Sequence, residues 1–175
     1  MNLLTQRLLL RSLAPIDKAS IYEYRSDSET NKYQGWIPKT LDEVEEFIAK
    51  IPNFLNEPDT WYQIGIIEKE SNILVGDIGI HFLSDNEQVE IGCTLMKMYH
   101  GKGYATEALK GIIDYIFKVL KKHRIIASVD PNNKSSMKLL NRLNFRQEGH
   151  FIESLFFKGE WVDDVTFAIL NREWI

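Results

Sequence analysis

The chain has 175 residues, of which 44% are hydrophobic and 26% are charged, and it carries a formal net charge of −4. This composition predicts one globular domain spanning residues 1–175 and excludes a disordered chain. The net negative charge excludes a protein whose whole surface is adapted to nucleic acid. The lone Cys93 excludes an internal disulfide. No stretch approaches the roughly 20 consecutive apolar residues of a membrane span. Because the amino terminus lacks a basic segment followed by an apolar run, we expect a cytoplasmic protein that binds neither nucleic acid nor membrane.

The first half of the chain is predicted to form a strand, two helices and three further strands. Apolar residues 8–10 predict the first strand, and Pro15 predicts the start of a helix. Thr40 is a favourable helix cap, because Glu43 follows three residues later and apolar residues then recur at helical spacing up to position 51. Alternating segments separated by polar turns predict an antiparallel meander at residues 61–67, 73–82 and 89–96.

The second half begins with two glycines and a long amphipathic helix over residues 105–120. The basic residues 121–123 follow, and their cations suit the carboxyl end of a helix dipole. Residues 124–129 predict a short strand, after which Asn132 or Asn133 caps another helix. Two last strands, 145–152 and 162–170, are joined through a hairpin turn at Lys158-Gly159-Glu160. The elements together predict a mixed α/β domain with helices on the faces of its sheet.

The glycines lie between a strand and the amino end of the long helix. Because glycine has no Cβ, backbone N–H groups there can approach an anion closely, and the helix dipole favours negative charge. The spacing does not fit a Walker A loop, since Lys102 lies between Gly101 and Gly103 and no Ser or Thr follows at the required place. A dinucleotide fingerprint does not fit either, because Thr106 stands in place of the third glycine and the preceding strands are predicted to be antiparallel.

The segment His100-Gly101-Lys102-Gly103-Tyr104-Ala105 resembles the Gln/Arg-x-x-Gly-x-Gly/Ala loop of the GNAT (GCN5-related N-acetyltransferase) superfamily. Its continuation through Leu109 is similar to the branch that contains ribosomal-protein-alanine N-acetyltransferases, the RimJ/RimL type. Segments 5–11, 75–79 and 133–145 agree in order and spacing, so the resemblance covers nearly the whole chain. His100 departs from the usual Gln or Arg, and Asn144 replaces the usual glycine before a phenylalanine. A backbone cradle does not need the usual Gln or Arg side chain at position 100. Asparagine at position 144 tolerates the left-handed backbone angles that a glycine would adopt.

The resemblance implies the GNAT fold: a central, twisted, mostly antiparallel sheet of about seven strands, splayed between strands 4 and 5 and flanked by about four helices. It also implies acetyl-CoA as the cosubstrate, with the strand before the loop bulged and Cys93, Thr94 and Leu95 lining the acetyl and pantetheine channel. Asn133 matches the cofactor-contacting asparagine of the family, although a role as helix cap explains it equally well. The loop residues that the resemblance assigns to the cofactor are His100, Gly101, Lys102, Gly103, Tyr104, Ala105 and Thr106.

Glu90 is our candidate general base, acting directly or through water, because strand alternation sets it on one face with Thr94. A solvated strand carboxylate explains Glu90 equally well. Leu140 stands where many family members have a tyrosine acid, which leaves Ser136 as the candidate hydrogen-bond donor to the CoA thiolate or as a simple helix-start serine. A nucleophilic Cys93 is the alternative to direct attack by the amine. The histidines lack metal-ligand spacing, so we expect no metal site.

The amine acceptor is the least determined part of the sequence-based hypothesis. An α-amine with a pKa of about 7.7 to 8.0 is roughly a tenth neutral at pH 7, whereas a lysine near 10.4 is neutral about once in two thousand. We therefore expect direct transfer to a primary amine, with a protein amino terminus of the ribosomal type favoured. A polyamine, an aminoglycoside or an amino acid is an alternative acceptor, and a non-catalytic acyl-CoA sensor is an alternative from another class. By resemblance, Tyr33 and Trp36 border the acceptor site, and exposed aromatics such as Trp161 and Trp174 suit a homodimer.

Overall fold

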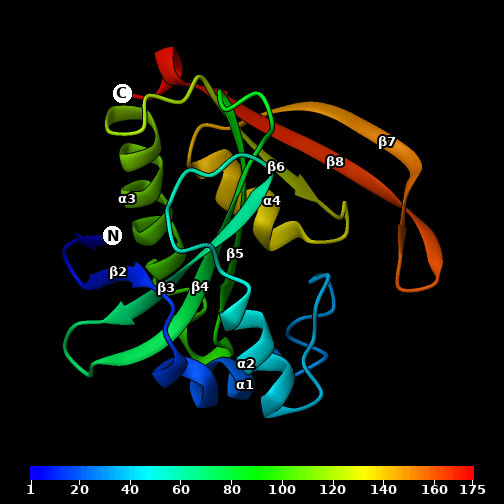
Figure 1. The fold of residues 1–175 in the computed structure, drawn as a ribbon. Coiled ribbons are helices and arrows are strands. Elements are labelled where there is room, and N and C mark those ends of the chain that lie inside the picture. Colours follow the sequence, from blue (N-terminus) through cyan, green and yellow to red (C-terminus); the bar gives the residue numbers. More distant parts are fainter.

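The computed structural model describes residues 1–175 as one eight-stranded sheet with four α-helices (Figure 1). The predicted α/β class, strands and helices are confirmed, and β1, too short for a periodicity signal, is an additional strand. The strands are β1 (Asn2–Leu4), β2 (Leu8–Ser12), β3 (Thr60–Glu68), β4 (Ile73–Phe82), β5 (Gln88–Leu95), β6 (Arg124–Val129), β7 (Arg146–Phe157) and β8 (Glu160–Leu170). The helices are α1 (Lys18–Arg25), α2 (Leu41–Ala49), α3 (Tyr104–Lys118) and α4 (Lys134–Arg142), with 3₁₀ turns at Pro15–Asp17, Lys97–Tyr99 and Asn171–Glu173.

The sheet divides between β5 and β6. Its order is β1-β2-β3-β4-β5-β6-β8-β7, and every neighbouring pair is antiparallel except β5 with β6. This parallel pair extends only from Gln88 opposite Arg124 to Glu90 opposite Ile126, beyond which the two strands separate. The predicted splay is thus confirmed. The bulge expected in β5 is not found: β5 pairs with β4 without a register shift, and Gly76 allows the strands to lie so close that a Cβ there would be 2.2 Å from the Thr94 carbonyl oxygen.

Two apolar clusters lie on opposite faces of the sheet. The main core of 29 buried residues joins α3 and α4 to one face. A smaller cluster of 7 buried residues joins α1 and α2 to the other. The neighbours Ile66 and Ile67 on β3 belong to different clusters, because successive side chains of a strand point to opposite faces.

Several element boundaries follow from local signals in the sequence. Thr40 caps α2, since its side chain accepts a hydrogen bond from the Glu43 N–H at 3.2 Å. The Glu43 carboxylate extends beyond the cap and accepts from the Lys39 N–H at 2.7 Å. The turn Lys158-Gly159 joins β7 to β8 with φ angles of 51° and 95°, as a type I′ hairpin requires.

The end of α3 differs from the prediction. The helix ends at Lys118, and Lys121 adopts a φ of 59° outside it. Lys122 is 2% exposed, and its ammonium donates to the backbone and side-chain oxygens of Asn86. Asn86, which is distant in the sequence, therefore holds the Lys122 ammonium away from the end of the helix. The basic residue in the last turn of α3 is Lys118.

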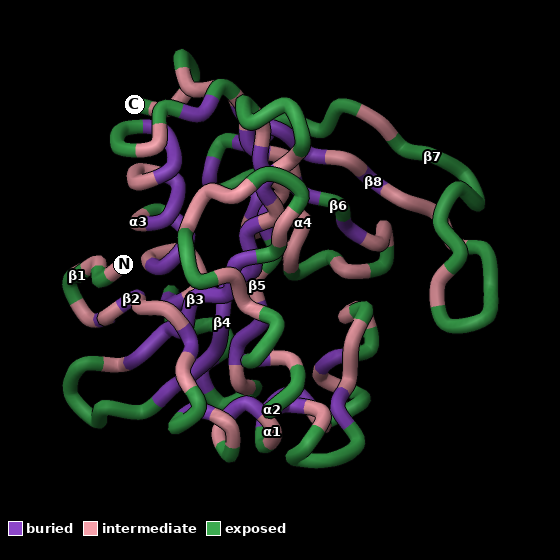
Figure 2. Tube along the Cα trace, in the orientation of Figure 1, coloured by how far each residue is buried: buried purple, intermediate pink, exposed green.

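Burial is concentrated in the central strands and α3, whereas β7 is exposed along most of its length (Figure 2). The hairpin that β7 forms with β8 extends away from the rest of the sheet (Figure 1) and carries the exposed apolar side chains of Phe151, Phe156 and Trp161. Trp161 is 61% exposed, as expected. The same expectation is wrong for Trp174, which packs against the main core and donates its indole N–H to Asp114 at 2.8 Å.

Candidate active site

The glycine loop before α3 leaves the first backbone amides of the helix unpaired. Gly101 and Gly103 have φ angles of 74° and 83°, at which an L side chain is strained, and Gly103 immediately precedes the helix. The N–H groups of Tyr104, Ala105 and Thr106 have no acceptor within the chain. With the positive end of the helix dipole, these amides form a cradle suited to a phosphate group.

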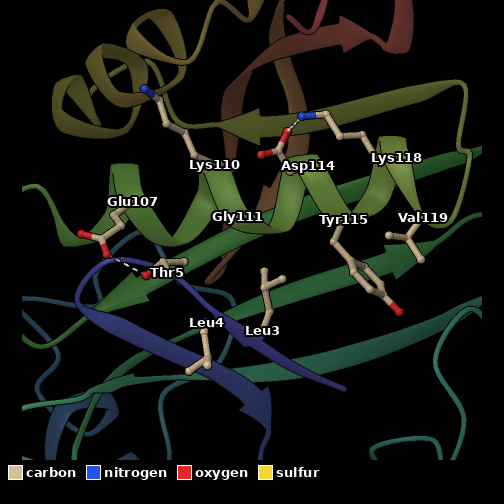
Figure 3. Close-up of a pocket in the computed structure, with 10 residues that line it drawn as sticks. All are labelled: Leu3, Leu4, Thr5, Glu107, Lys110, Gly111, Asp114, Tyr115, Lys118 and Val119. Atoms are coloured by element: carbon tan, nitrogen blue, oxygen red, sulfur yellow. Dashed lines mark hydrogen bonds and ion pairs between the residues drawn. The ribbon is translucent and has the colours of Figure 1, made fainter.

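Arg7 fixes the loop from the amino-terminal segment. Its Nη1 donates to the Lys102 carbonyl at 3.0 Å, and its guanidinium lies 4.3 Å from the centre of the Tyr104 ring. Its Nε pairs with Glu107 at 2.7 Å, and the Thr5 hydroxyl donates to the same carboxylate at 2.6 Å (Figure 3). Burial opposes ionisation of Glu107, but these hydrogen bonds outweigh it and lower the pKa of the carboxyl. Sequence reasoning missed this arrangement, although the segments that carry the resemblance include all of its residues.

Two side chains of the predicted cofactor loop have partners in the neighbouring strands β5 and β3. His100 Nε2 lies 2.9 Å from the Leu95 carbonyl oxygen, and the buried Tyr104 donates its hydroxyl to Glu68. The ammonium of Lys102 lies 5.4 Å from the centre of the Tyr99 ring. These side chains shape the loop, and the backbone amides remain available.

The three β5 residues predicted to line the channel divide between the two faces of the sheet. Thr94 is 6% exposed and lies on the face that carries α1 and α2. Cys93 and Leu95 pack against the main core on the opposite face. Burial raises the pKa of the Cys93 thiol to about 12, so the thiol is protonated at neutral pH. A protonated thiol is a poor nucleophile.

A pocket of about 690 Å³ opens on the face that carries Thr94. Its floor consists of alternating residues of β3, β4 and β5, and its wall comes from the segment between α1 and α2 and from the end of α2. Trp36 lines this wall and stacks on Phe47 with ring centres 4.4 Å apart. Tyr33 lies outside the lining, where the Lys32 ammonium is 5.3 Å from its ring. The floor residues are Trp61, Gln63, Gly79, Gly92 and Thr94.

A buried ion pair supports this pocket from below. Arg25 and Asp77 are 7% and 0% exposed, and two guanidinium nitrogens of Arg25 donate to the two carboxylate oxygens. The Tyr24 hydroxyl donates to the same carboxylate. Burial would lower the pKa of Arg25, but the Asp77 charge outweighs it and raises that pKa. The Arg25 guanidinium also lies 5.6 Å from the Trp36 ring, so the pair holds part of the pocket wall. Nothing in the sequence pattern indicated this ion pair.

Glu90 lies beyond the floor of the pocket on the same face of β5. It is opposite His81 in register, with Oε2 and Nδ1 3.9 Å apart, and His81 stacks on Trp61 at 4.8 Å. Burial raises the pKa of Glu90; His81 lowers it and the nearby Asp164 raises it further. A carboxyl with a raised pKa beside a pocket suits proton transfer.

The start of α4 contains the other two predicted residues. Asn133 caps this helix, because its Oδ1 accepts from the Ser136 N–H at 3.2 Å. The Ser136 side chain is half-buried and its hydroxyl has no partner within the chain. Arg142, at the end of α4, donates to the Thr106 hydroxyl at 3.2 Å and so joins α4 to the first turn of α3. Leu140 is buried in the main core.

A second hollow of about 450 Å³ lies between β1 and α3 (Figure 3). Leu3 lines one side, and Gly111 lies opposite, where a Cβ would be 3.1 Å from Leu3. This hollow shares no residue with the pocket over Thr94.

The chain contains no cluster of three or more His, Cys, Asp or Glu side chains able to hold a metal ion. No helix is both long enough and apolar enough to cross a membrane.

Comparison with known proteins connects this geometry to a family. Residues 7–146 match the family model described as an acetyltransferase (GNAT) domain. The uncharacterized N-acetyltransferase YnaD of Bacillus subtilis is 34% identical over 99% of this chain and 99% of its own. A crystal structure of an acetyltransferase (GNAT family) from Bacillus anthracis superposes with a TM-score of 0.90 at 33% identity, covering 99% of this chain and 100% of that one.

Relatives whose names include an acceptor are less similar. The [ribosomal protein uS5]-alanine N-acetyltransferase of Escherichia coli is 29% identical, over 99% of this chain and 92% of its own. The spermidine N(1)-acetyltransferase of Vibrio cholerae is 24% identical, over 98% of both chains. One name refers to a protein alanine and the other to a polyamine, so similarity alone does not select the acceptor.

Proposed function

Because this chain belongs to the GNAT family of acetyltransferases, we propose that it transfers the acetyl group of acetyl-CoA to a primary α-amine at a protein amino terminus, such as that of a ribosomal protein. Acetyl transfer follows from the family, and relatives in it act on amines. The observation that carries the proposal is that β5 connects the amide cradle with the pocket. The strand leads into the amide cradle at one end and forms the floor of the pocket through Thr94. A single domain working in the cytoplasm, where ribosomal proteins are made, suits this role.

GNAT acetyltransferases use acetyl-CoA, whose thioester supplies an activated acetyl group. The amides of Gly101 to Thr106 are the groups that we assign to its pyrophosphate, with Asn133 at the neighbouring start of α4. Beyond Glu90, the edge of β5 that faces β6 is unpaired, which leaves backbone groups for the amides of the pantetheine arm. Both features fit the cosubstrate.

Within this site, Glu90 receives the proton that the acceptor amine loses, directly or through water. Its position on the face that carries Gly92 and Thr94, together with its raised pKa, supports this role. The amine attacks the thioester directly, since the protonated Cys93 offers no nucleophile. The unpaired Ser136 hydroxyl at the start of α4 is the proposed hydrogen-bond donor to the departing thiolate.

A thiol-release assay with a panel of amines tests this function. The panel contains a short peptide with a free amino terminus, the same peptide with a blocked amino terminus, spermidine, an aminoglycoside and a free amino acid. We expect turnover with the free peptide, none with the blocked one, and mass spectrometry showing one acetyl group on the α-amine. Acetyl-CoA binding without turnover on any amine would mean a sensor rather than an enzyme. Fast turnover of spermidine with a slow reaction of the peptide would contradict the assigned acceptor.

A further inference from the structure

The amino-terminal segment 5–7 is part of the sequence resemblance, but acetyl transfer as proposed gives it no role. The segment is fixed next to the end of β3, where Lys69 donates its backbone N–H to the Arg7 carbonyl at 2.9 Å and its ammonium to the Thr5 carbonyl at 2.8 Å. From this support it contacts the start of α3, 100 positions further along the chain. The segment is therefore placed to affect the amide cradle that α3 presents.

Glu107, in the first turn of α3, receives three hydrogen bonds from this segment. Its carboxylate accepts from the Thr5 hydroxyl at 2.6 Å (Figure 3). It also accepts from the Arg7 backbone N–H at 2.6 Å and from Arg7 Nε at 2.7 Å, and only 16% of the Glu107 side chain is exposed. Residues 104–106, whose unpaired N–H groups form the cradle, lie in the same helical turn. Holding Glu107 in place therefore holds the orientation of these amides.

The Arg7 guanidinium extends the same contact into the glycine loop. Its Nη1 donates to the Lys102 carbonyl at 3.0 Å while its Nε holds Glu107, so one planar group joins the loop to the helix. The guanidinium also packs on the loop, since its Nη2 is 3.4 Å from the place a Cβ of Gly103 would take. Glycine backbones adopt many conformations, and a site whose donors must be ordered on binding loses affinity. Arg7 thus restricts the loop before any ligand binds.

Charge gives Arg7 a second way to affect the cradle. A carboxylate in the first turn of a helix repels the phosphate that the helix dipole attracts. The Arg7 cation lies 2.7 Å from the Glu107 carboxylate and compensates this repulsion. Any cation at this place would compensate the charge, whereas joining Lys102 to Glu107 requires the planar, forked guanidinium. Geometry and charge therefore predict different effects of substitutions at positions 7 and 107.

We propose that Arg7 is a positioning residue for acetyl-CoA: its guanidinium joins the Lys102 carbonyl to the Glu107 carboxylate and so holds the loop amides in the arrangement that the pyrophosphate binds. This inference rests on the proposed function, which assigns the pyrophosphate to these amides, and adds the side chain that sets the affinity of the site. Because coupling between two equilibria is reciprocal, bound acetyl-CoA in turn holds the amino-terminal segment on α3.

Calorimetric titration of CoA into the parent protein and its variants tests the positioning role without turnover. Arg7→Met should weaken CoA binding about tenfold, the effect of losing one hydrogen bond to a charged group. Arg7→Lys should weaken it nearly as much, because an ammonium does not reproduce the fork between Lys102 and Glu107. Arg11→Met is the matched control: it breaks a comparable fork on the same strand, at 2.7 Å to both oxygens of Asp17, and should leave CoA affinity unchanged.

Glu107→Gln separates geometry from charge. The substitution removes the negative charge beside the cradle and weakens the hydrogen bonds that hold Arg7. The positioning role predicts CoA binding that is weaker by a few-fold, whereas an effect of charge alone predicts tighter binding. In steady-state kinetics, Arg7→Met should raise the acetyl-CoA KM and leave the acceptor KM unchanged.

Hydrogen exchange measures the reciprocal effect of the ligand. The Arg7 N–H donates to Glu107, so it should exchange more slowly when CoA is bound to the parent protein. The Glu153 N–H, which donates to Asp163 at 2.9 Å in the β7–β8 hairpin, is the control and should exchange at the same rate with and without CoA. An Arg7 N–H whose exchange CoA leaves unchanged would contradict the coupling.

Three results would overturn the inference: unchanged CoA affinity of Arg7→Met, full affinity of Arg7→Lys, or tighter binding by Glu107→Gln. CoA binding that depends on Arg7, together with no turnover of any amine, would remove the proposed function and retain the inference. Turnover with a CoA affinity independent of Arg7 would do the reverse. Melting temperatures check that the variants are folded, and if Arg7→Met does not fold, Arg7→Lys carries the comparison because it keeps the charge.

Discussion

Glu90 shows how its surroundings prepare a carboxyl for proton transfer. Burial raises the pKa of Glu90, and the like charge of Asp164 raises it further. A general base acts only when deprotonated, so the rate should fall as the pH drops through this raised pKa. We expect Glu90→Gln to lower kcat about a hundredfold and to remove the acidic limb of the pH–rate profile. Rates at saturating acceptor across the acidic and neutral range measure both effects.

Asp164→Asn provides the matched comparison. The substitution removes the like charge and retains the shape of the side chain, so the pKa of Glu90 should fall and the acidic limb should move to lower pH. The rate on the alkaline side should stay close to that of the parent protein. If the acidic limb of Asp164→Asn lies at the same pH as that of the parent protein, a group other than Glu90 sets the pH dependence.

Cys93 is expected to be chemically silent. Its pKa of about 12 keeps the thiol protonated, and the side chain packs against the main core. Cys93→Ala should therefore retain kcat within about twofold, and the native thiol should resist alkylation by iodoacetamide at neutral pH. Mass spectrometry after alkylation, with and without denaturant, measures the second effect. An acetylated Cys93 in a reaction quenched with acid would contradict direct transfer.

Loss of the Asp77 charge should strongly reduce stability. Asp77→Asn leaves the Arg25 charge buried without a counter-ion, which typically costs about 3 to 5 kcal/mol in the free energy of unfolding. Chemical denaturation measures the change. The control is Glu45→Gln, which breaks the exposed pair with Lys18 and should leave the denaturation midpoint nearly unchanged. Similar losses of unfolding free energy for the two variants would show that the buried pair contributes no more to stability than the exposed one.

The cofactor loop makes a prediction at the scale of elements. Gly103→Ala places a Cβ on a residue with a φ of 83°, which costs about 1 to 2 kcal/mol in the native loop geometry. Because the same backbone presents the α3 amides, the acetyl-CoA KM should rise several-fold while the acceptor KM stays constant. Gly159→Ala imposes the same strain on the β7–β8 turn, where φ is 95°, and should lower stability without changing the acetyl-CoA KM. A rise of that KM in both variants would indicate a general loss of structure.

Elements with local signals were predicted well. The cap Thr40 and the turn at Gly159 depend on residues a few positions apart, so the local sequence contains what determines them. The two glycines of the loop were likewise found from local spacing, although Arg7 holds the loop from a distance. The end of α3 was predicted wrongly because a distant partner, Asn86, takes Lys122 out of the helical pattern. β1 was missed because three residues carry no periodicity. Boundaries that depend on tertiary contacts are thus the ones that sequence periodicity cannot place.

At the scale of the whole molecule, the exposed apolar side chains of the β7–β8 hairpin lead us to expect a homodimer. Exposed apolar patches often mark association sites. Light scattering at increasing concentration should give a mass above 20.4 kDa, and Trp161→Ser should shift it toward the monomer. Phe54→Ser, at a side chain that is 73% exposed elsewhere, should have no effect. A monomeric mass for the parent protein at every concentration would refute the dimer.

The candidate site was predicted only in part, for a reason that concerns the whole molecule. The amide cradle is local, but the pocket depends on sheet register. Arg25 meets Asp77 across 52 positions of sequence, and Gln63 meets Gly79 through the pairing of β3 with β4. The predicted meander pairs β3 with β4 and β4 with β5 but does not give their register, and no pattern places α1 against β4, so the pocket floor and the ion pair beneath it emerged only from the folded chain.

The place of β8 between β6 and β7 also has a consequence for how the protein is made. β8 follows β6 and β7 in the chain, yet it fills the gap between them in the sheet. Until it emerges, a nascent chain has an unpaired edge on β6 and no sheet partner for β7, and such edges favour contacts with other chains. We expect this half of the sheet to form only after β8 has been synthesised, which makes the nascent chain a client for chaperones in the interval.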